Sequence, residues 1–202
     1  MRPALAPALA LSLALAVPAA ATPEYVLPTL FDVTGVAADD VLNIRERPDT
    51  KAPIIGRLAP DATRVEVVGE RSGWMQVNTG ERSGWVNGRY LAYRVDVWEA
   101  GRLPEGLRCL GTEPFWSLTP EGGDLVLATP EGDSRMALRK VLDSGWFRDP
   151  RRALVGDGVT AVIAPAQCSD GMSDRAYGLE ATVILGGGAA AQMLNGCCTL
   201  AR

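Results

Sequence analysis

Short runs of alternating hydrophobic and polar residues, separated by turn residues, occupy most of this chain. The clearest run covers residues 74–79, in which Met75 and Val77 alternate with polar or aromatic neighbours. Residues 80–84, which begin and end with glycine, follow it, and Trp85 opens the next run. Alternation with a period of two residues, interrupted by a glycine-bounded turn, predicts a β-hairpin.

The rest of the first half continues this pattern. About five or six short strands, with a turn about every 8–12 residues, fit into about 65 residues, and this spacing predicts a small β-barrel. Besides the hairpin, the expected strands are residues 30–36, 41–45, 54–58 and 63–68, and residues 89–91 close the unit.

The second half is also predicted to consist of strands. Turn sequences at residues 120–123 and 130–133 divide residues 115–141 into a three-stranded antiparallel meander. No stretch of useful length has the period of an amphipathic helix. The half therefore reads as a second small antiparallel β-barrel or sandwich, with an irregular segment at 143–152, a loop at 168–174 and further strands at 159–164, 177–185 and 189–195.

These patterns predict an all-β protein with two domains, residues 27–93 and 108–202. The connector, residues 94–107, is polar and rich in turn residues. Within it, Val95 and Val97 alternate with polar residues and Trp98 follows, which predicts that part of the connector is a strand tying the two halves together.

Several motifs of the first half carry a family resemblance. Leu42-Asn43-Ile44-Arg45, Gly73-Trp74, Gly84-Trp85-Val86 and Tyr90-Leu91 occur in this order, and together they resemble the bacterial SH3-like domain over about residues 30–93. The chain departs from the family at Pro60-Asp61, where a glycine is usual, but both sequences suit a turn. The resemblance implies a cell-wall binding module of an exported protein, with peptidoglycan or a peptide as its ligand.

The candidate ligand-binding residues are Trp74, Tyr90, Asn43, Arg45 and Trp85. Asn43 and Arg45 flank Ile44 in a predicted strand, so they share the face opposite to it. We expect Trp85 to pack in the barrel core, whereas Trp74 fits a binding groove and the core equally well. Arg45 also has a structural alternative, an ion pair with Asp39 or Asp40, which we favour over ligand contact.

Residues 1–21 have the organisation of a secretory signal peptide. Arg2 supplies a positive charge, residues 4–17 form an Ala/Leu run, and small residues precede an expected cleavage after Ala21. The apolar run is short for a membrane span, which favours cleavage over an uncleaved anchor. No other segment is long and apolar enough to cross a membrane, and we expect a periplasmic or secreted protein.

All four cysteines, Cys109, Cys168, Cys197 and Cys198, lie in the second half. An even number of cysteines in an oxidising compartment predicts disulfides. A bond between the adjacent Cys197 and Cys198 would strain the intervening peptide, so each is expected to reach Cys109 or Cys168, in an order that the sequence leaves open. The alternative, a four-thiolate zinc site, lacks the close paired spacing of such sites.

The composition argues against several functions. The net charge is -4, with 20 Lys and Arg against 24 Asp and Glu and no basic cluster, which argues against nucleic acid or an anionic membrane as the main partner. The chain has no histidine, which excludes Ser-His-Asp and Cys-His catalysis and any histidine metal site. We expect no cofactor and no metal.

One catalytic alternative remains, a pair of carboxylates formed by Glu113 with Asp170 or Asp174. Glycoside hydrolysis requires two such groups at a defined separation. Acidic residues in loops are more often solvated, and we therefore expect a protein that is not an enzyme.

The second half resembles an uncharacterised group of exported bacterial domains through its Gly-x-Glu-Pro-Phe-Trp and Cys-x-Asp-x-Met-Ser motifs, which begin at Gly111 and Cys168. That resemblance implies no activity. The expected function is a non-catalytic module that docks on peptidoglycan or an envelope protein through the SH3-like domain. The alternatives are a structural or interaction protein without a glycan ligand, and a carboxylate hydrolase.

Overall fold

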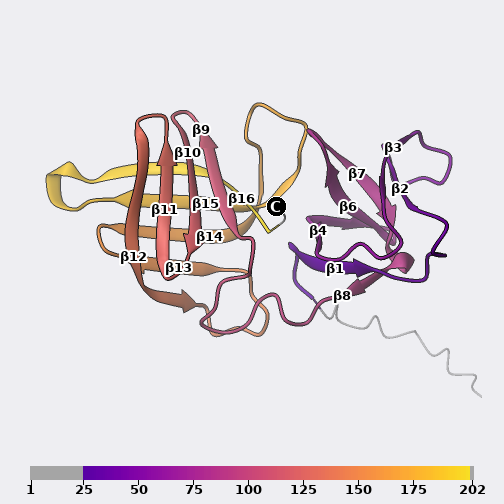
Figure 1. The fold of residues 1–202 in the computed structure, drawn as a ribbon, viewed down its shortest axis with the longest axis horizontal. Coiled ribbons are helices and arrows are strands. Elements are labelled where there is room, and N and C mark those ends of the chain that lie inside the picture. Colours follow the sequence, from indigo (N-terminus) through magenta and orange to yellow (C-terminus); the bar gives the residue numbers. More distant parts are fainter. Residues whose placement is uncertain (1–24, 201–202) are drawn as a thin grey trace, which may run out of the picture.

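The computed structural model describes residues 25–200, so the signal-peptide prediction and the cleavage after Ala21 lie outside the described residues. Strands make up most of this part of the chain, and they are arranged in two bodies that lie side by side (Figure 1). The first body contains β1–β8 and a short 3₁₀ helix, and the second contains β9–β16. The expected all-β class is confirmed.

The first body consists of two sheets that enclose a small core. One sheet has the order β4-β1-β8 and the other has the order β3-β2-β7-β6-β5. Phe31, Ile44, Val67, Val77 and Val86 are buried between them. The strands are β1 (Thr29–Val33), β2 (Leu42–Arg45), β3 (Ile54–Leu58), β4 (Val65–Val67), β5 (Gly69–Arg71), β6 (Trp74–Thr79), β7 (Arg82–Asn87) and β8 (Leu91–Tyr93), and the 3₁₀ helix η1 covers Gly88–Tyr90.

The predicted hairpin is formed by β6 and β7. Val77 pairs with Gly84 across it, and Thr79 pairs with Arg82. The turn is therefore shorter than the sequence suggested, because residues 82–84 belong to β7. Gly84 is buried, and a side chain there would meet Ile44 and Ile55, so this glycine serves close packing and not the turn.

The second body is a closed antiparallel barrel, which decides between the barrel and the sandwich that the sequence left open. Its strand order is β10-β11-β12-β13-β14-β15-β16-β9. The sequence missed β9 and β13. The strands are β9 (Arg108–Thr112), β10 (Phe115–Glu121), β11 (Asp124–Thr129), β12 (Gly132–Asp143), β13 (Arg152–Gly156), β14 (Val159–Cys168), β15 (Tyr177–Leu185) and β16 (Gln192–Thr199), and the 3₁₀ helix η2 covers Gly188–Ala190.

A buried indole in the barrel interior packs against two glycines. Trp116 is buried at the end of the barrel where β9, β10 and β16 meet. Its ring lies so close to Gly111 and Gly196 that a Cβ atom on either glycine would overlap the indole. These two glycines thus provide the space in which the indole packs.

The connector differs from its prediction, because residues 94–107 contain no strand. Val97 and Trp98 are instead buried in the hydrophobic cluster of the barrel. The Trp98 indole N–H donates to the carbonyl of Pro28 at 2.8 Å, so this residue bridges the two bodies. The apolar spacing of the connector reflects packing against the barrel, and not strand pairing.

Two disulfides resolve the order of the cysteines. Cys109 on β9 is bonded to Cys198, and Cys168 at the end of β14 is bonded to Cys197. Neighbouring residues of a strand point to opposite faces, so Cys197 and Cys198 on β16 can each reach a different partner. The bridges span 89 and 29 residues of sequence. Each contributes on the order of 3–4 kcal/mol by constraining the unfolded chain.

Buried polar contacts join the two bodies. Glu66 on β4 is 5 % exposed, and its carboxylate accepts hydrogen bonds from the Leu200 amide at 3.0 Å and from the Thr199 hydroxyl. On the hairpin, the Asn78 side-chain amide donates to the Ala176 carbonyl at 2.8 Å and accepts from the Ala176 amide at 3.0 Å. Because an amide side chain that pairs with both the N–H and the C=O of one residue fixes the orientation of that backbone segment, the seam is specific as well as close.

A second set of seam contacts comes from the backbone of the loop that follows β14. The Ser83 amide donates to the carbonyl of Asp174, and the Asp174 amide donates to the carbonyl of Glu81, both at 2.9 Å. The loop therefore adds a short bridge to the edge of the β6–β7 hairpin.

The packing at Gly196 gives a first prediction. In Gly196→Ala the new Cβ overlaps the Leu110 carbonyl and the Trp116 ring, so we expect the free energy of unfolding to fall by about 1–3 kcal/mol. Chemical denaturation followed by tryptophan fluorescence measures this change. Gly187→Ala is the matched control, because a Cβ atom added at Gly187 would have no other atom within 4 Å. Equal stability of the two variants would contradict the packing role of Gly196.

Candidate functional site

A groove of about 570 Å³ lies on the first body. Its walls come from the outer face of β2 and β6, from η1, and from the segment between β1 and β2. Four of the five predicted ligand-binding residues line it, namely Asn43, Arg45, Trp74 and Tyr90. The remaining lining residues are Gly35, Val36, Ala37, Asp40, Val41, Leu42, Thr50, Asn87 and Arg89.

Strand alternation places these side chains. Leu42 and Ile44 of β2 are buried in the core, so Asn43 and Arg45 are turned outward and are half-buried. On β6, Met75 is buried and Trp74 is half-buried on the outer face. Trp74 therefore belongs to the groove and not to the core. The sequence had fitted both positions equally well.

Arg45 is held by the backbone and not by an acid. Its guanidinium donates to the Ala52 carbonyl at 2.8 Å. Asp40, one of the two expected partners, accepts instead from the amide of Val41 at 2.8 Å. The expected ion pair of Arg45 with Asp39 or Asp40 is therefore wrong. The turn after β2 brings Ala52 within reach of the arginine, and no ion pair of Arg45 is found among residues 25–200.

Tyr90 enters the groove from η1. Asn87 caps this helix, because its side-chain oxygen accepts from the Arg89 amide at 3.1 Å. The Arg89 guanidinium lies 4.7 Å from the centre of the Tyr90 ring, a cation–π distance. Tyr93, the next tyrosine along the chain, packs against Tyr25 and Phe31.

Trp85 differs from its prediction. It is half-buried on the outer face of β7, opposite Arg45 and Gln76 in the strand register, and it belongs neither to the core nor to the groove lining. The expected core position is wrong because Gly84 and Val86 occupy the inward positions on either side of it. Strand alternation counted from the buried Val86 correctly places the Trp85 side chain on the outer face of the sheet.

The groove is chemically mixed. It offers an indole and a phenol ring, the positive charges of Arg45 and Arg89, the carboxylate of Asp40, and amide groups from Asn43 and Asn87. No hydrogen bond from the Asn43 side chain or the Trp74 indole N–H is found within residues 25–200. Such a surface can stack on a flat apolar face and can also bind carbonyl or carboxylate oxygens.

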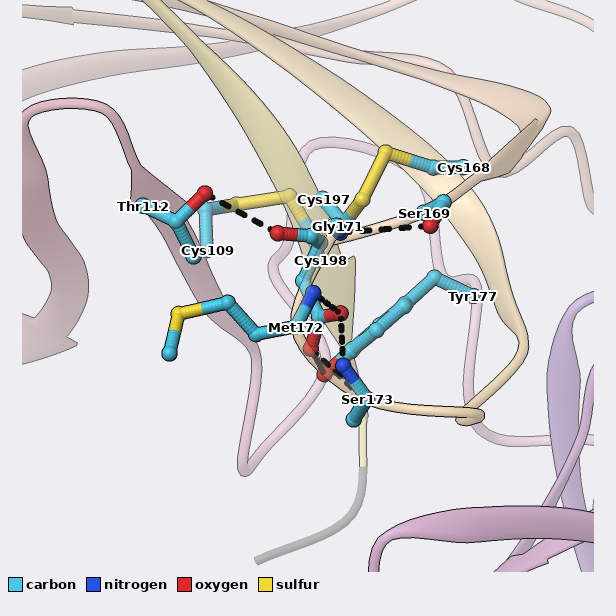
Figure 2. Close-up of a disulfide and its surroundings, with 11 residues drawn as sticks. Cys109, Thr112, Cys168, Ser169, Gly171, Met172, Ser173, Tyr177, Cys197 and Cys198 are labelled. Carbon is cyan, nitrogen blue, oxygen red and sulfur yellow. Dashed lines mark hydrogen bonds between the residues drawn. A yellow bond between two sulfur atoms is a disulfide. The ribbon is translucent and has the colours of Figure 1, made fainter.

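Asp170, a candidate catalytic acid, holds the loop after β14 in place. Its carboxylate accepts from the amides of Met172 and Ser173 and from the hydroxyls of Ser173 and Tyr177, at 2.8–3.0 Å. Partial burial raises the pKa of this carboxyl, but these donors outweigh it and lower the pKa to about 2. The same loop is tied to Cys197 by Cys168 and to β9 by a hydrogen bond from Thr112 (Figure 2). A carboxylate with four donors orders its own loop.

The side chains of the other two acidic candidates take no part in this network. Glu113 is exposed in the turn between β9 and β10, and Asp174 is exposed and contacts the first body through its backbone. Within residues 25–200, no three His, Cys, Asp or Glu residues cluster as metal ligands. Hydrolysis by Glu113 with Asp170 or Asp174 stays an untested alternative to the expected non-catalytic protein.

The comparison with known families bears on the first body. Residues 40–92 match the family model of the bacterial SH3 domain. The match includes the four predicted residues that line the groove, and it confirms the resemblance of the first half. No curated protein and no solved structure matches the chain.

The Asp170 network predicts a pH-dependent stability. Because its folded pKa is lowered to about 2 from 3.8, the carboxylate stabilises the fold above about pH 4, and this contribution is lost as the pH falls toward 2. We expect Asp170→Asn to lower the free energy of unfolding at pH 7 by on the order of 1–2 kcal/mol, allowing for partial exposure.

Denaturation of this variant and of the wild type across pH 2–7 measures the effect, and the two curves should converge at the acidic end. Asp174→Asn serves as the control, because its seam contacts come from the backbone. A constant difference between wild type and Asp170→Asn at every pH would contradict the assigned role.

Proposed function

We propose that this protein is an exported, non-catalytic binding module that docks on cell-wall peptidoglycan, or on an envelope protein or peptide, through the groove of its SH3-like domain. The observation that carries the proposal is the convergence of Asn43, Arg45, Trp74 and Tyr90 in one groove within the region that matches the bacterial SH3 domain.

The groove chemistry supports this class of ligand. Peptidoglycan and peptides both present amide groups and carboxylates next to apolar surfaces. Arg45 and Arg89 suit carboxylates, and the half-buried Trp74 suits an apolar face. The contact of Arg45 with Ala52 holds its side chain in place before binding, which reduces the entropy lost on binding.

Two further observations are compatible with export. Both disulfides form within the barrel, and stable disulfides are typical of oxidising compartments. No helix within residues 25–200 has the length and apolar character of a membrane span.

Replacing the groove indole tests the proposal. We expect Trp74→Ala to reduce retention of the protein on purified cell-wall sacculi by about tenfold, since a buried aromatic anchor commonly contributes more than about 1.4 kcal/mol to binding. Sedimentation with sacculi over a range of concentrations measures the affinity.

Trp85→Ala is the matched control, because Trp85 is also a half-buried indole on the outer face of the same sheet but lies outside the groove. Equal loss in the two variants, or unchanged retention of a folded Trp74→Ala, would favour a structural protein without a glycan ligand.

Export makes a separate prediction. Protein isolated from its native compartment should begin at Thr22 and should contain no free thiol. A non-reducing peptide map should join the peptides of Cys109 and Cys198, and those of Cys168 and Cys197. An intact Met1 together with titratable thiols would contradict the proposed location.

A further inference from the structure

Two large aromatic side chains project from the loop between β12 and β13. Trp146 and Phe147 are each 81 % exposed, although they are adjacent in the sequence. Single exposed apolar residues are ordinary, but two neighbouring aromatic rings in water form a patch that usually marks an interaction site. The fold itself gains little from them, because they contribute no buried surface to the barrel core.

The loop that carries these rings is firmly held. Arg152, which is 2 % exposed, donates to the backbone carbonyls of Glu99 and Arg102 in the connector, and to those of Asp149 and Arg151 in the loop, at 2.6–3.0 Å. A buried guanidinium with four carbonyl acceptors joins the loop and the connector into one unit.

Asp143 makes a second set of hydrogen bonds between the loop and the connector. Its carboxylate accepts from the Gly145 amide at 2.8 Å and from the Gly101 amide at 2.7 Å, so it too links the loop to the connector. The Ser144 hydroxyl closes the loop by donating to Asp149 at 2.5 Å. The aromatic rings are therefore presented by a preorganised surface.

A cavity of about 630 Å³, which we call the aromatic cavity, lies between this loop and the connector. Trp98 is buried and also lines the cavity, so it forms the floor, with the Arg152 guanidinium 5.1 Å from its ring. Trp146 and Phe147 form one wall. The volume lies within the range of small-molecule sites.

The charged residues that line the aromatic cavity are two acids, Asp143 and Glu99, and two arginines, Arg148 and Arg152. Backbone hydrogen bonds from Gly145 and Gly101 lower the pKa of Asp143, so this group remains ionised. Glu99 also lines the cavity, and Asp149 lies in the same loop. Carboxylate oxygens accept hydrogen bonds from hydroxyl groups, and guanidinium groups donate to hydroxyl oxygens, so this lining suits a ligand rich in hydroxyls.

We propose that the aromatic cavity binds a sugar ring of a glycan chain, with the apolar face of the ring stacked on Trp146 and its hydroxyls donating to Asp143 and Glu99. This inference extends the proposed function and rests on it for the source of the glycan, because cell-wall peptidoglycan contains glycan strands. A second site on a chain whose two bodies are joined by buried contacts increases the overall affinity for a polymer through effective concentration.

The test uses the full mature chain and chitotetraose, a linear tetramer of N-acetylglucosamine, as the probe. We expect Trp146→Ala and Phe147→Ala to weaken chitotetraose binding in calorimetry by about tenfold or more each. Phe115→Ala is the matched control, since Phe115 is an exposed aromatic residue on β10 outside the cavity, and it should bind as the wild type does. Asp143→Asn should weaken binding without removing the aromatic rings.

Each outcome decides one proposal. Wild-type binding that survives in both Trp146→Ala and Phe147→Ala, or no binding of chitotetraose by the wild type, would overturn the sugar site. Association of the wild type with anionic vesicles, or a dimer that Trp146→Ala dissociates, would also overturn it in favour of another occupant. If Trp146→Ala no longer binds chitotetraose and Trp74→Ala keeps full retention on sacculi, the groove proposal fails and the sugar site stands. If Trp146→Ala still binds chitotetraose and Trp74→Ala loses retention on sacculi, only the sugar site is rejected.

Discussion

The opposite orientation of two adjacent cysteines on β16 organises the second half of the molecule. Cys198 bonds to Cys109 and thereby fastens the two strands that close the barrel. Cys197 bonds to Cys168 and fixes the start of the loop that docks on the β6–β7 hairpin. One strand thus determines both the closure of the barrel and the placement of the neighbouring domain, because successive residues of a strand face opposite sides.

The seam between the two bodies depends on polar groups that are matched in detail. Glu66 would be costly to bury alone, but the Thr199 hydroxyl and the Leu200 amide satisfy its carboxylate. Asn78 pairs with both backbone groups of Ala176. Apolar contacts accompany them, since Leu30 of β1 belongs to the hydrophobic cluster of the barrel. Such a seam fixes one relative orientation, because any sliding would leave buried polar groups unpaired.

Features with a local origin could be predicted from the sequence. Alternation placed Asn43 and Arg45 on one face, and it located the β6–β7 hairpin. The family motifs brought Trp74 and Tyr90 into the same candidate site. Trp85 is the exception, because its position before Val86 and the closing Tyr90 predicts a core residue, whereas strand alternation from the buried Val86 turns it outward.

Features that depend on distant parts of the chain could not be predicted. The segment between β1 and β2 lines the groove only because the fold brings it beside Trp74. The order of the disulfides required the register of β16 against β9. The partner of Arg45, the carbonyl of Ala52, has no side-chain signal in the sequence. The spacing of Val95, Val97 and Trp98 predicted a strand. Trp98 instead packs in the barrel and donates a hydrogen bond to the Pro28 carbonyl of the first body.

The burial of Leu200 beside Glu66 has a consequence for the order of assembly. During synthesis the SH3-like domain emerges before β16, so Glu66 on β4 lacks its partners Thr199 and Leu200 until these much later residues arrive. The barrel cannot close, and Cys198 cannot bond to Cys109, before the same residues are synthesised. Completion of the earlier domain is therefore coupled to the final steps of the later one, and the two mature together.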